Sequence, residues 1–176
     1  MKTIRNQENM KLAEALSIRK SLSVKLVGLR DRLYNMVKVP EGDTPAEDPK
    51  ELIDEIDKTC VRLEKYITVI NKTNLSIKNN LGESMTSLLA KRDVLKSQID
   101  ILRNAFDQAT STSSRYSRGE IKYVSAVDVI SLRDKIDGLS KKYRELDMEI
   151  QTLNFSSELI ELVDNEADDV LDLLDI

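Results

Sequence analysis

Residues Pro49 to Ile77 read PKELIDEIDKTCVRLEKYITVINKTNLSI, and this stretch decides the fold of the chain. Its apolar and near-apolar positions follow one another in alternating steps of four and three residues, the spacing of a seam along an α-helix. The seam consists of Leu52, Ile56, Thr59, Leu63, Tyr66, Ile70, Thr73 and Ile77. A second row, Ile53, Cys60 and Ile67, repeats every seven residues beside it. A stripe this wide predicts a core-facing helix of a bundle rather than one strand of a two-stranded coiled coil.

Three further segments carry a comparable seam, so four long heptad-patterned helices are expected. The other three cover about 10–37, 85–109 and 129–153. Asp48 can accept a hydrogen bond as the N-cap of the helix that begins at Pro49. With only 5 Gly and 3 Pro in 176 residues, the composition favours long helices over a turn-rich β fold. The predicted fold class is all-α, an antiparallel bundle of two long helical hairpins, with a short β-like segment at 121–127 before the fourth helix.

The two hairpins are predicted to be copies of one another. A shift of 73 residues places Arg19 on Arg92, and a shift of 80 residues places Asn74 on Asn154. Sliding any two heptad helices into phase explains matches between apolar residues, but it does not explain matches between polar ones. We therefore expect a duplicated hairpin packed about a pseudo-twofold axis.

Three regions are predicted along the chain: a frayed N-terminal extension (1–9), a helical bundle domain (10–157) and an acidic amphipathic C-terminal tail (158–176). The tail holds eight acidic residues and no basic one, whereas the whole chain has 27 Lys and Arg against 31 Asp and Glu. The body before the tail is therefore weakly basic. The tail is expected either to dock on a basic groove of its own body or of a partner protein, or to serve only as a solubilising extension.

The composition argues against an enzyme. The chain has no histidine, which removes Ser-His-Asp and Cys-His arrangements, His-bearing zinc sites and the commonest general base. Cys60 is the only cysteine, and we expect it to be a small buried hydrophobe in a reducing compartment. Acidic residues such as Glu51 and Asp54 could hold Mg²⁺, but their place in the first helical turns favours the helix-dipole interpretation. We expect no catalytic residue, no cofactor and no metal.

Neither a secretory signal nor a membrane-spanning segment is expected in this sequence. Residues 1–9 have no apolar core of a secretory signal. No uncharged apolar run approaches the roughly 20 residues that a bilayer requires. A soluble cytoplasmic protein is expected.

A structural polar seam is predicted inside the bundle. Arg19 and Arg92 occupy seam positions, where an unpaired charge would be costly. We expect Arg19 to meet Asn71 or Asn74, and Arg92 to meet Asp147 or Glu149. Such groups either form a polar site or fix the register and assembly state of the helices. The predicted seam consists of Arg19, Arg92, Asn71, Asn74 and Asn154.

A basic and aromatic segment precedes the fourth helix. Its residues of interest are Arg115, Tyr116, Arg118, Lys122 and Tyr123. Single-strand nucleic-acid binders combine these residue types, but the segment has few basic groups. We favour a strand or loop that packs over the bundle or pairs with a neighbouring subunit.

Several short strings in the chain match a known family. They are MKLAEAL (10–16), PAEDP (45–49), INKTN (70–74), KRDVL (91–95) and, above all, RYSRGEIKYV (115–124) with VDV (127–129). On these strings the chain resembles the septicolysin-like family of small bacterial proteins over about 10–154, with Gly119 at a position where a serine is expected. The resemblance implies a soluble, helical, oligomeric bacterial protein, and the family name suggests a cytolysin.

The favoured function is that of a non-enzymatic structural or interaction protein that self-associates into a homo-oligomer. A membrane-active cytolysin is an alternative, but charged residues such as Lys72, Lys91 and Asp100 interrupt the best hairpin for insertion. Nucleic-acid binding through the segment around Arg115 is another alternative, and it predicts an affinity that falls steeply with salt. Both alternatives are disfavoured relative to self-association.

Overall fold

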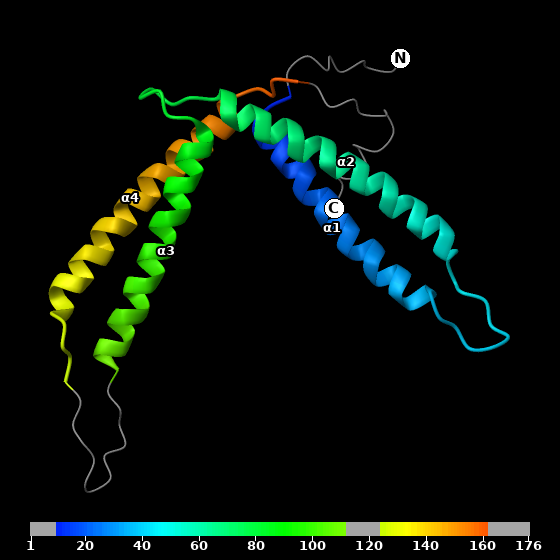
Figure 1. Ribbon diagram of the computed structural model, residues 1–176, viewed down its shortest axis with the longest axis horizontal. Helices are drawn as coiled ribbons and strands as arrows, with labels where there is room; N and C mark the ends of the chain where they lie inside the picture. The colour runs from blue at the N-terminus through cyan, green and yellow to red at the C-terminus, as the bar shows by residue number, and fades with distance from the viewer. Residues whose placement is uncertain (1–9, 112–123, 162–176) are drawn as a thin grey trace, which may run out of the picture. The chain divides into compact units, whose positions relative to one another are not determined.

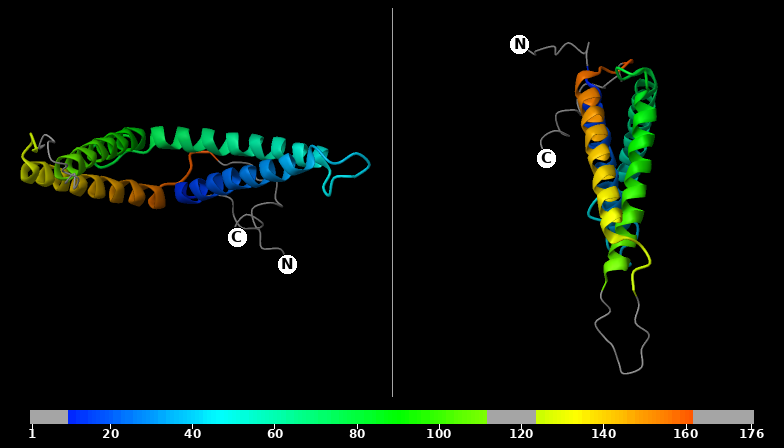
Figure 2. Two further views of the ribbon diagram at one scale, coloured as in Figure 1. Left: turned by 90° about the horizontal axis from the view of Figure 1, so that it is seen from below. Right: turned by 90° about the vertical axis from the view of Figure 1, so that its left-hand side faces the viewer.

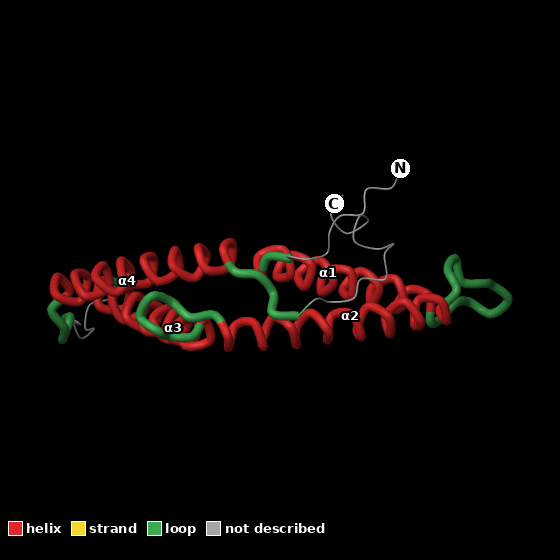
Figure 3. The backbone as a smooth tube through the Cα atoms, turned by 90° about the horizontal axis from the view of Figure 1, so that it is seen from above, coloured by secondary structure: helices red, strands yellow, loops and turns green. Residues whose placement is uncertain are grey.

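The computed structural model describes residues 10–111 and 124–161, and these residues lie only in helices and loops (Figure 1, Figure 3). The helices are α1 (Leu12–Met36), α2 (Pro49–Ser76), α3 (Met85–Thr110) and α4 (Val129–Ser156). The all-α fold class is confirmed. No helix within the described ranges combines the length and apolar character needed to span a membrane.

The described chain divides into two compact units. One contains residues 10–77 with 154–161, and the other contains residues 78–111 with 124–153. Each unit is built on one antiparallel hairpin, α1 with α2 in the first and α3 with α4 in the second (Figure 1, Figure 2). The expectation of one bundle domain over 10–157 stays a prediction.

The α1–α2 hairpin is closed by an apolar seam from both helices. Its buried members in α1 are Leu12, Ala15, Ile18, Leu22 and Leu29, and in α2 they are Leu52, Thr59, Tyr66, Val69, Ile70 and Thr73. Full burial of one such large side chain stabilises the hairpin by about 1.5–3 kcal/mol. The helical periodicity that the sequence predicts for α2 is therefore confirmed.

The start of α2 is also as predicted. The Asp48 side chain accepts a hydrogen bond from the Lys50 N–H at 2.9 Å, and Pro49 occupies the first turn, where a missing N–H costs nothing. In the preceding loop Glu47 pairs with Arg32 of α1. The Arg32 guanidinium lowers the pKa of Glu47, chiefly through their hydrogen bond.

The α3–α4 hairpin has fewer buried residues than the α1–α2 hairpin. They are Met85, Leu88, Ile99, Ile136, Ser140 and Ile150. Ser84 caps α3 by accepting a hydrogen bond from the Ser87 N–H at 3.2 Å. Asp128 caps α4: its carboxylate accepts hydrogen bonds from the Ser131 hydroxyl (2.7 Å) and the Ile130 N–H (3.0 Å). The Ser131 hydroxyl makes the largest contribution to lowering the pKa of Asp128.

The helix bounds repeat at the two shifts that the sequence predicts. Helices α2 and α4 each have 28 residues. The first residue of α4 lies 80 positions after the first residue of α2, and the same holds for their last residues. Helices α1 and α3 begin 73 positions apart. The same shifts relate two isolated antiparallel bridges, Lys78 with Ser84 and Lys11 with Glu158. Equivalent caps and bridges at equivalent positions support a duplicated hairpin.

The predicted β-like segment is not a strand in its described part, 124–127. Ser125 instead holds a local turn, because its hydroxyl donates to the Val127 carbonyl at 2.8 Å and accepts from the Val127 N–H at 3.3 Å. Serine side chains compete with sheet hydrogen bonding in this way. Residues 121–123 lie outside the described residues.

Candidate functional site

Residues 157–161, here named the strap, follow α4 and close the open end of the α1–α2 hairpin. The Leu12 N–H donates to the Ser157 carbonyl at 2.9 Å, and the Leu159 N–H donates to the Met10 carbonyl at 3.0 Å. Figure 1 shows this orange segment beside the blue start of α1. The strap therefore pairs with the residues at the beginning of α1 as a short antiparallel bridge.

The strap also contacts α2 near the end of that helix. The Ile160 N–H donates to the hydroxyl of Thr73, a fully buried residue, at 3.3 Å. Glu161 then forms an ion pair with Lys72 at 2.9 Å. The first four residues of the predicted tail, 158–161, thus belong to the folded unit, whereas 162–176 lie outside the described residues.

The second apolar row of α2 lies on the surface. Ile53 is 46% exposed and Ile67 is 39% exposed, and the expectation that Cys60 is buried is wrong, because its side chain is exposed. The physical reason is that α1 covers only the main seam of α2, while a row one position further round the helix is turned away from it. This row, Ile53, Cys60 and Ile67, is named the apolar row of α2.

The polar seam requires a correction at Arg19. Arg19 is exposed, and Ile18 is buried in its place. A seam that reaches Ala15 can continue by a step of three or of four residues, and the structure takes the step of three. Asn71 is exposed as well, while Asn74 and Asn154 are half-buried.

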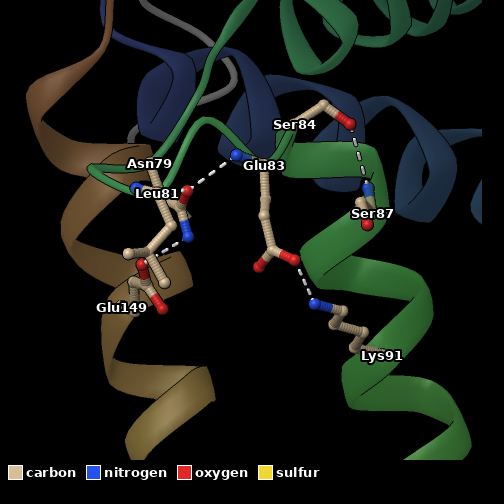
Figure 4. Close-up of polar contacts among 7 residues, drawn as sticks. All are labelled: Asn79, Leu81, Glu83, Ser84, Ser87, Lys91 and Glu149. Carbon is tan, nitrogen blue, oxygen red and sulfur yellow. Dashed lines mark hydrogen bonds and ion pairs between the residues drawn. The ribbon is translucent and has the colours of Figure 1, made fainter.

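Arg92 is half-buried and lies between two carboxylates. Its guanidinium is 2.9 Å from Asp93 and 3.8 Å from Asp147, one of its two expected partners. The other expected partner, Glu149, instead accepts a hydrogen bond from the Asn79 amide at 3.0 Å (Figure 4). These contacts tie α4 to α3 and to the loop before α3, so they fix packing.

The loop before α3 is organised by Asn79. Its side-chain oxygen accepts hydrogen bonds from the N–H groups of Leu81 (3.0 Å) and Glu83 (2.8 Å). Gly82 between them has φ +79°, which an L side chain rarely adopts. Glu83 pairs in turn with Lys91 on α3 (Figure 4). The polar groups of this loop are engaged with one another and serve to position the start of α3.

A shallow pocket of about 220 Å³ lies between α3 and α4. Its lining consists of Lys96, Ile99, Asp100, Arg103, Ser140, Tyr143 and Arg144. Arg103 donates a hydrogen bond to the Ser140 hydroxyl at 3.4 Å. The pocket holds three cationic groups against one carboxylate, so it would favour an anion.

Two other predictions concern the basic and aromatic segment before α4 and the absence of a metal site. The basic and aromatic segment with Arg115, Tyr116, Arg118, Lys122 and Tyr123 lies outside the described residues. In residues 10–111 and 124–161, no group of three or more Asp, Glu or Cys side chains is arranged to hold a metal ion.

The fold and these surfaces define an all-α protein of two helical hairpins. The chain belongs to a Family of unknown function (DUF6847), which it matches over residues 19–159. It is similar to a functionally unknown conserved protein from Corynebacterium diphtheriae, with 38% sequence identity and a TM-score of 0.81. That match covers 86% of this chain and 99% of the crystal structure's chain. The comparison with curated proteins finds no match.

The expected membership of the septicolysin-like family is therefore wrong. The family that covers the same part of the chain is DUF6847, and the similar crystal structure has no known function. The strings behind that resemblance are only three to ten residues long. Strings this short do not establish membership of a family, whereas the match to DUF6847 extends over residues 19–159.

Proposed function

We propose that the protein is a non-enzymatic interaction protein that self-associates through the apolar row of α2. The observation that carries this proposal is the exposure of Ile53, Cys60 and Ile67 at seven-residue spacing on one long helix. Apolar residues with this period pack efficiently against a second helix that carries the same period. A second copy of this chain provides such a helix.

The row suits a twofold arrangement because it is symmetric in sequence about Cys60. Antiparallel pairing of two α2 helices would set Ile53 against the partner subunit's Ile67. The two Cys60 side chains would then meet at the axis. Isologous contacts of this kind are the commonest way in which soluble proteins dimerise.

Sequence composition supports a non-enzymatic role. The chain contains no histidine and a single cysteine. In the anion-favouring pocket between α3 and α4, the Ser140 hydroxyl accepts a hydrogen bond from Arg103, which cannot act as a base. We propose the cytoplasm as the location, which an exposed free thiol at Cys60 would suit.

Light scattering at a series of protein concentrations tests the proposal. We expect a dimer, and we expect the Ile67→Glu variant to be a monomer, because a carboxylate placed in an apolar contact must be desolvated. Val24→Glu is the matched control: Val24 is 61% exposed on α1 and lies outside the row. A monomeric wild-type protein, or equal dissociation by both variants, would overturn the proposed surface.

Cys60 offers an independent readout because it is the only thiol. A short bismaleimide reagent should link two copies through Cys60 in high yield, and Ile67→Glu should abolish the link. Cys60→Ser should remain dimeric by light scattering while losing the covalent product. A dimer that the reagent does not link would place the self-association on another face.

A further inference from the structure

We infer that the acidic residues 162–176 bind along a row of lysines on α2 of the same chain, running antiparallel to that helix. The row consists of Lys58, Lys65 and Lys72, which are spaced by seven residues and therefore lie along one face of α2. It is named the lysine row. The occupant is the part of the chain that directly follows the strap.

The strap sets the starting point and the direction. Ile160 is hydrogen-bonded to Thr73, and the next residue, Glu161, is paired with Lys72. One step forward in the strap is therefore one step backward along α2. A chain that continues in the same sense reaches the lower-numbered turns of α2, where Lys65 and Lys58 are exposed.

The sequence of the tail has the matching period. Glu161, Asp168 and Asp175 are spaced by seven residues, as are Lys72, Lys65 and Lys58 in the reverse order. With the first pair observed, a helical tail would place Asp168 beside Lys65 and Asp175 beside Lys58. Seven residues advance a helix by about 10.5 Å on either side, so the register holds over both repeats.

Length and charge agree with this arrangement. Residues 162–176 would span about 22 Å as a helix, and Lys72 and Lys58 are about 21 Å apart along α2. The tail beyond the strap carries six acidic residues and no basic one. Val61, which is 55% exposed and follows Lys58 by three residues, offers an apolar contact on the same side of α2.

Because the strap attaches the tail to the hairpin, weak ion pairs are sufficient to hold the tail on the lysine row. Ion pairs between exposed side chains are individually weak. The strap is already hydrogen-bonded to α1 and α2, so the tail is presented to the lysine row at a high effective concentration. The bound tail would cover a cationic face of α2 against other anionic ligands.

Carbodiimide coupling of the full chain, followed by mass spectrometry, tests the register directly. This reagent joins a lysine to a carboxylate only when the two groups are in contact, with loss of water. We expect Lys65 to couple to Asp168 and Lys58 to couple to Asp175. An equal mixture of isotopically light and heavy protein should give products within one chain only.

Charge reversal provides the matched comparison. Lys65→Glu should lower coupling of the tail to α2 roughly fivefold, because it replaces an attraction by a repulsion at the centre of the row. Combining Lys65→Glu with Asp168→Lys should restore the contact, seen as a coupled product between positions 65 and 168 with the two charges exchanged. Lys20→Glu, at an exposed lysine of α1 outside the row, should leave the coupling unchanged.

Three results would overturn the inference: no coupling between the tail and α2, coupling spread evenly over exposed lysines such as Lys20, or products only between chains. Each variant changes exposed side chains, and circular dichroism checks that the helices are retained. The test is independent of self-association, since the monomeric Ile67→Glu variant should show the same products within one chain.

Discussion

Lys11 and Glu158 are joined by a 2.8 Å ion pair, although 147 positions separate them in the sequence. Both side chains are substantially exposed, at 39% and 44%, so the charges themselves contribute little. The backbone hydrogen bonds on either side of the pair, Leu12 to Ser157 and Leu159 to Met10, hold the strap. The strap thus fastens the chain after α4 to the beginning of α1.

Thr73 is the buried anchor of the strap on α2. Thr73→Val keeps the shape of the side chain but removes the oxygen that accepts the Ile160 N–H. We expect a loss of about 1 kcal/mol in the free energy of unfolding, measured by urea denaturation, and faster amide exchange at Ile160. Thr68→Val is the control, because Thr68 is exposed on the same helix. An equal loss in both variants would show that the hydroxyl of Thr73 has no special part.

The register of α1 gives a second prediction. Ile18 is 5% exposed, so Ile18→Ala should lower the free energy of unfolding by about 2–5 kcal/mol through lost burial and a residual cavity. Arg19→Ala changes an exposed side chain and should stay within about 0.5 kcal/mol of wild type. Thermal and urea unfolding measure both variants. A larger loss of stability for Arg19→Ala than for Ile18→Ala would instead place Arg19 in the core, as predicted from the sequence.

Arg19 illustrates what helical periodicity can and cannot decide. The seam of α2 follows from its sequence, because apolar residues are available at nearly every step. In α1 both Ile18 and Arg19 follow Ala15 at permitted spacings. The match of Arg19 with Arg92 under the 73-residue shift favoured Arg19 as the seam residue, whereas Ile18 is the one that is buried. The helix bounds repeat at the predicted shifts, but the matched arginines have different surroundings, since Arg92 meets Asp147 and Arg19 is exposed.

The cap of α4 yields a prediction about pH. Hydrogen bonds from Ser131 and Ile130 lower the pKa of Asp128 below its usual value of 3.8. A carboxylate whose pKa is lower in the folded state stabilises the fold above its unfolded pKa, and this stabilisation is lost as the pH falls through the folded pKa.

Asp128→Asn keeps a capping oxygen but cannot ionise, so it isolates this contribution. The stability difference between wild type and Asp128→Asn should be constant near neutral pH and should shrink below about pH 3.8. Urea midpoints measured from neutral to acidic pH check this. A difference that persists unchanged at the lowest pH would mean that the charge of Asp128 adds nothing to the cap.

The strap was not foreseeable from the sequence in the way that the helices were. Its pairing with Met10 and Leu12 uses backbone groups, which leave no residue-type signature. The acidic composition of the tail left two alternatives open, docking on a basic surface or a solubilising extension. The choice of surface depended on one observed contact, Glu161 with Lys72, because several helices of the chain carry lysines.

Salt should act in opposite directions on the two proposed contacts. Asp57 and Glu64 are exposed beside the apolar row of α2, so pairing two copies brings like charges together. Screening, which shortens the Debye length from about 10 Å at 0.1 M to about 3 Å at 1 M salt, relieves this repulsion. Added sodium chloride should therefore tighten the dimer, measured by light scattering, and should reduce coupling of the tail to the lysine row.

A variant separates the two effects within one protein. Asp57→Asn combined with Glu64→Gln removes the acidic groups beside the apolar row but leaves Lys58, Lys65 and Lys72 in place. Its dimer should be tighter at low salt and nearly insensitive to salt, while its tail coupling should fall with salt as in wild type. A wild-type dimer that weakens with salt would point to charged groups rather than the apolar row. Tail coupling that does not change with salt would reject charge pairing with the lysine row, because exposed ion pairs must respond to screening.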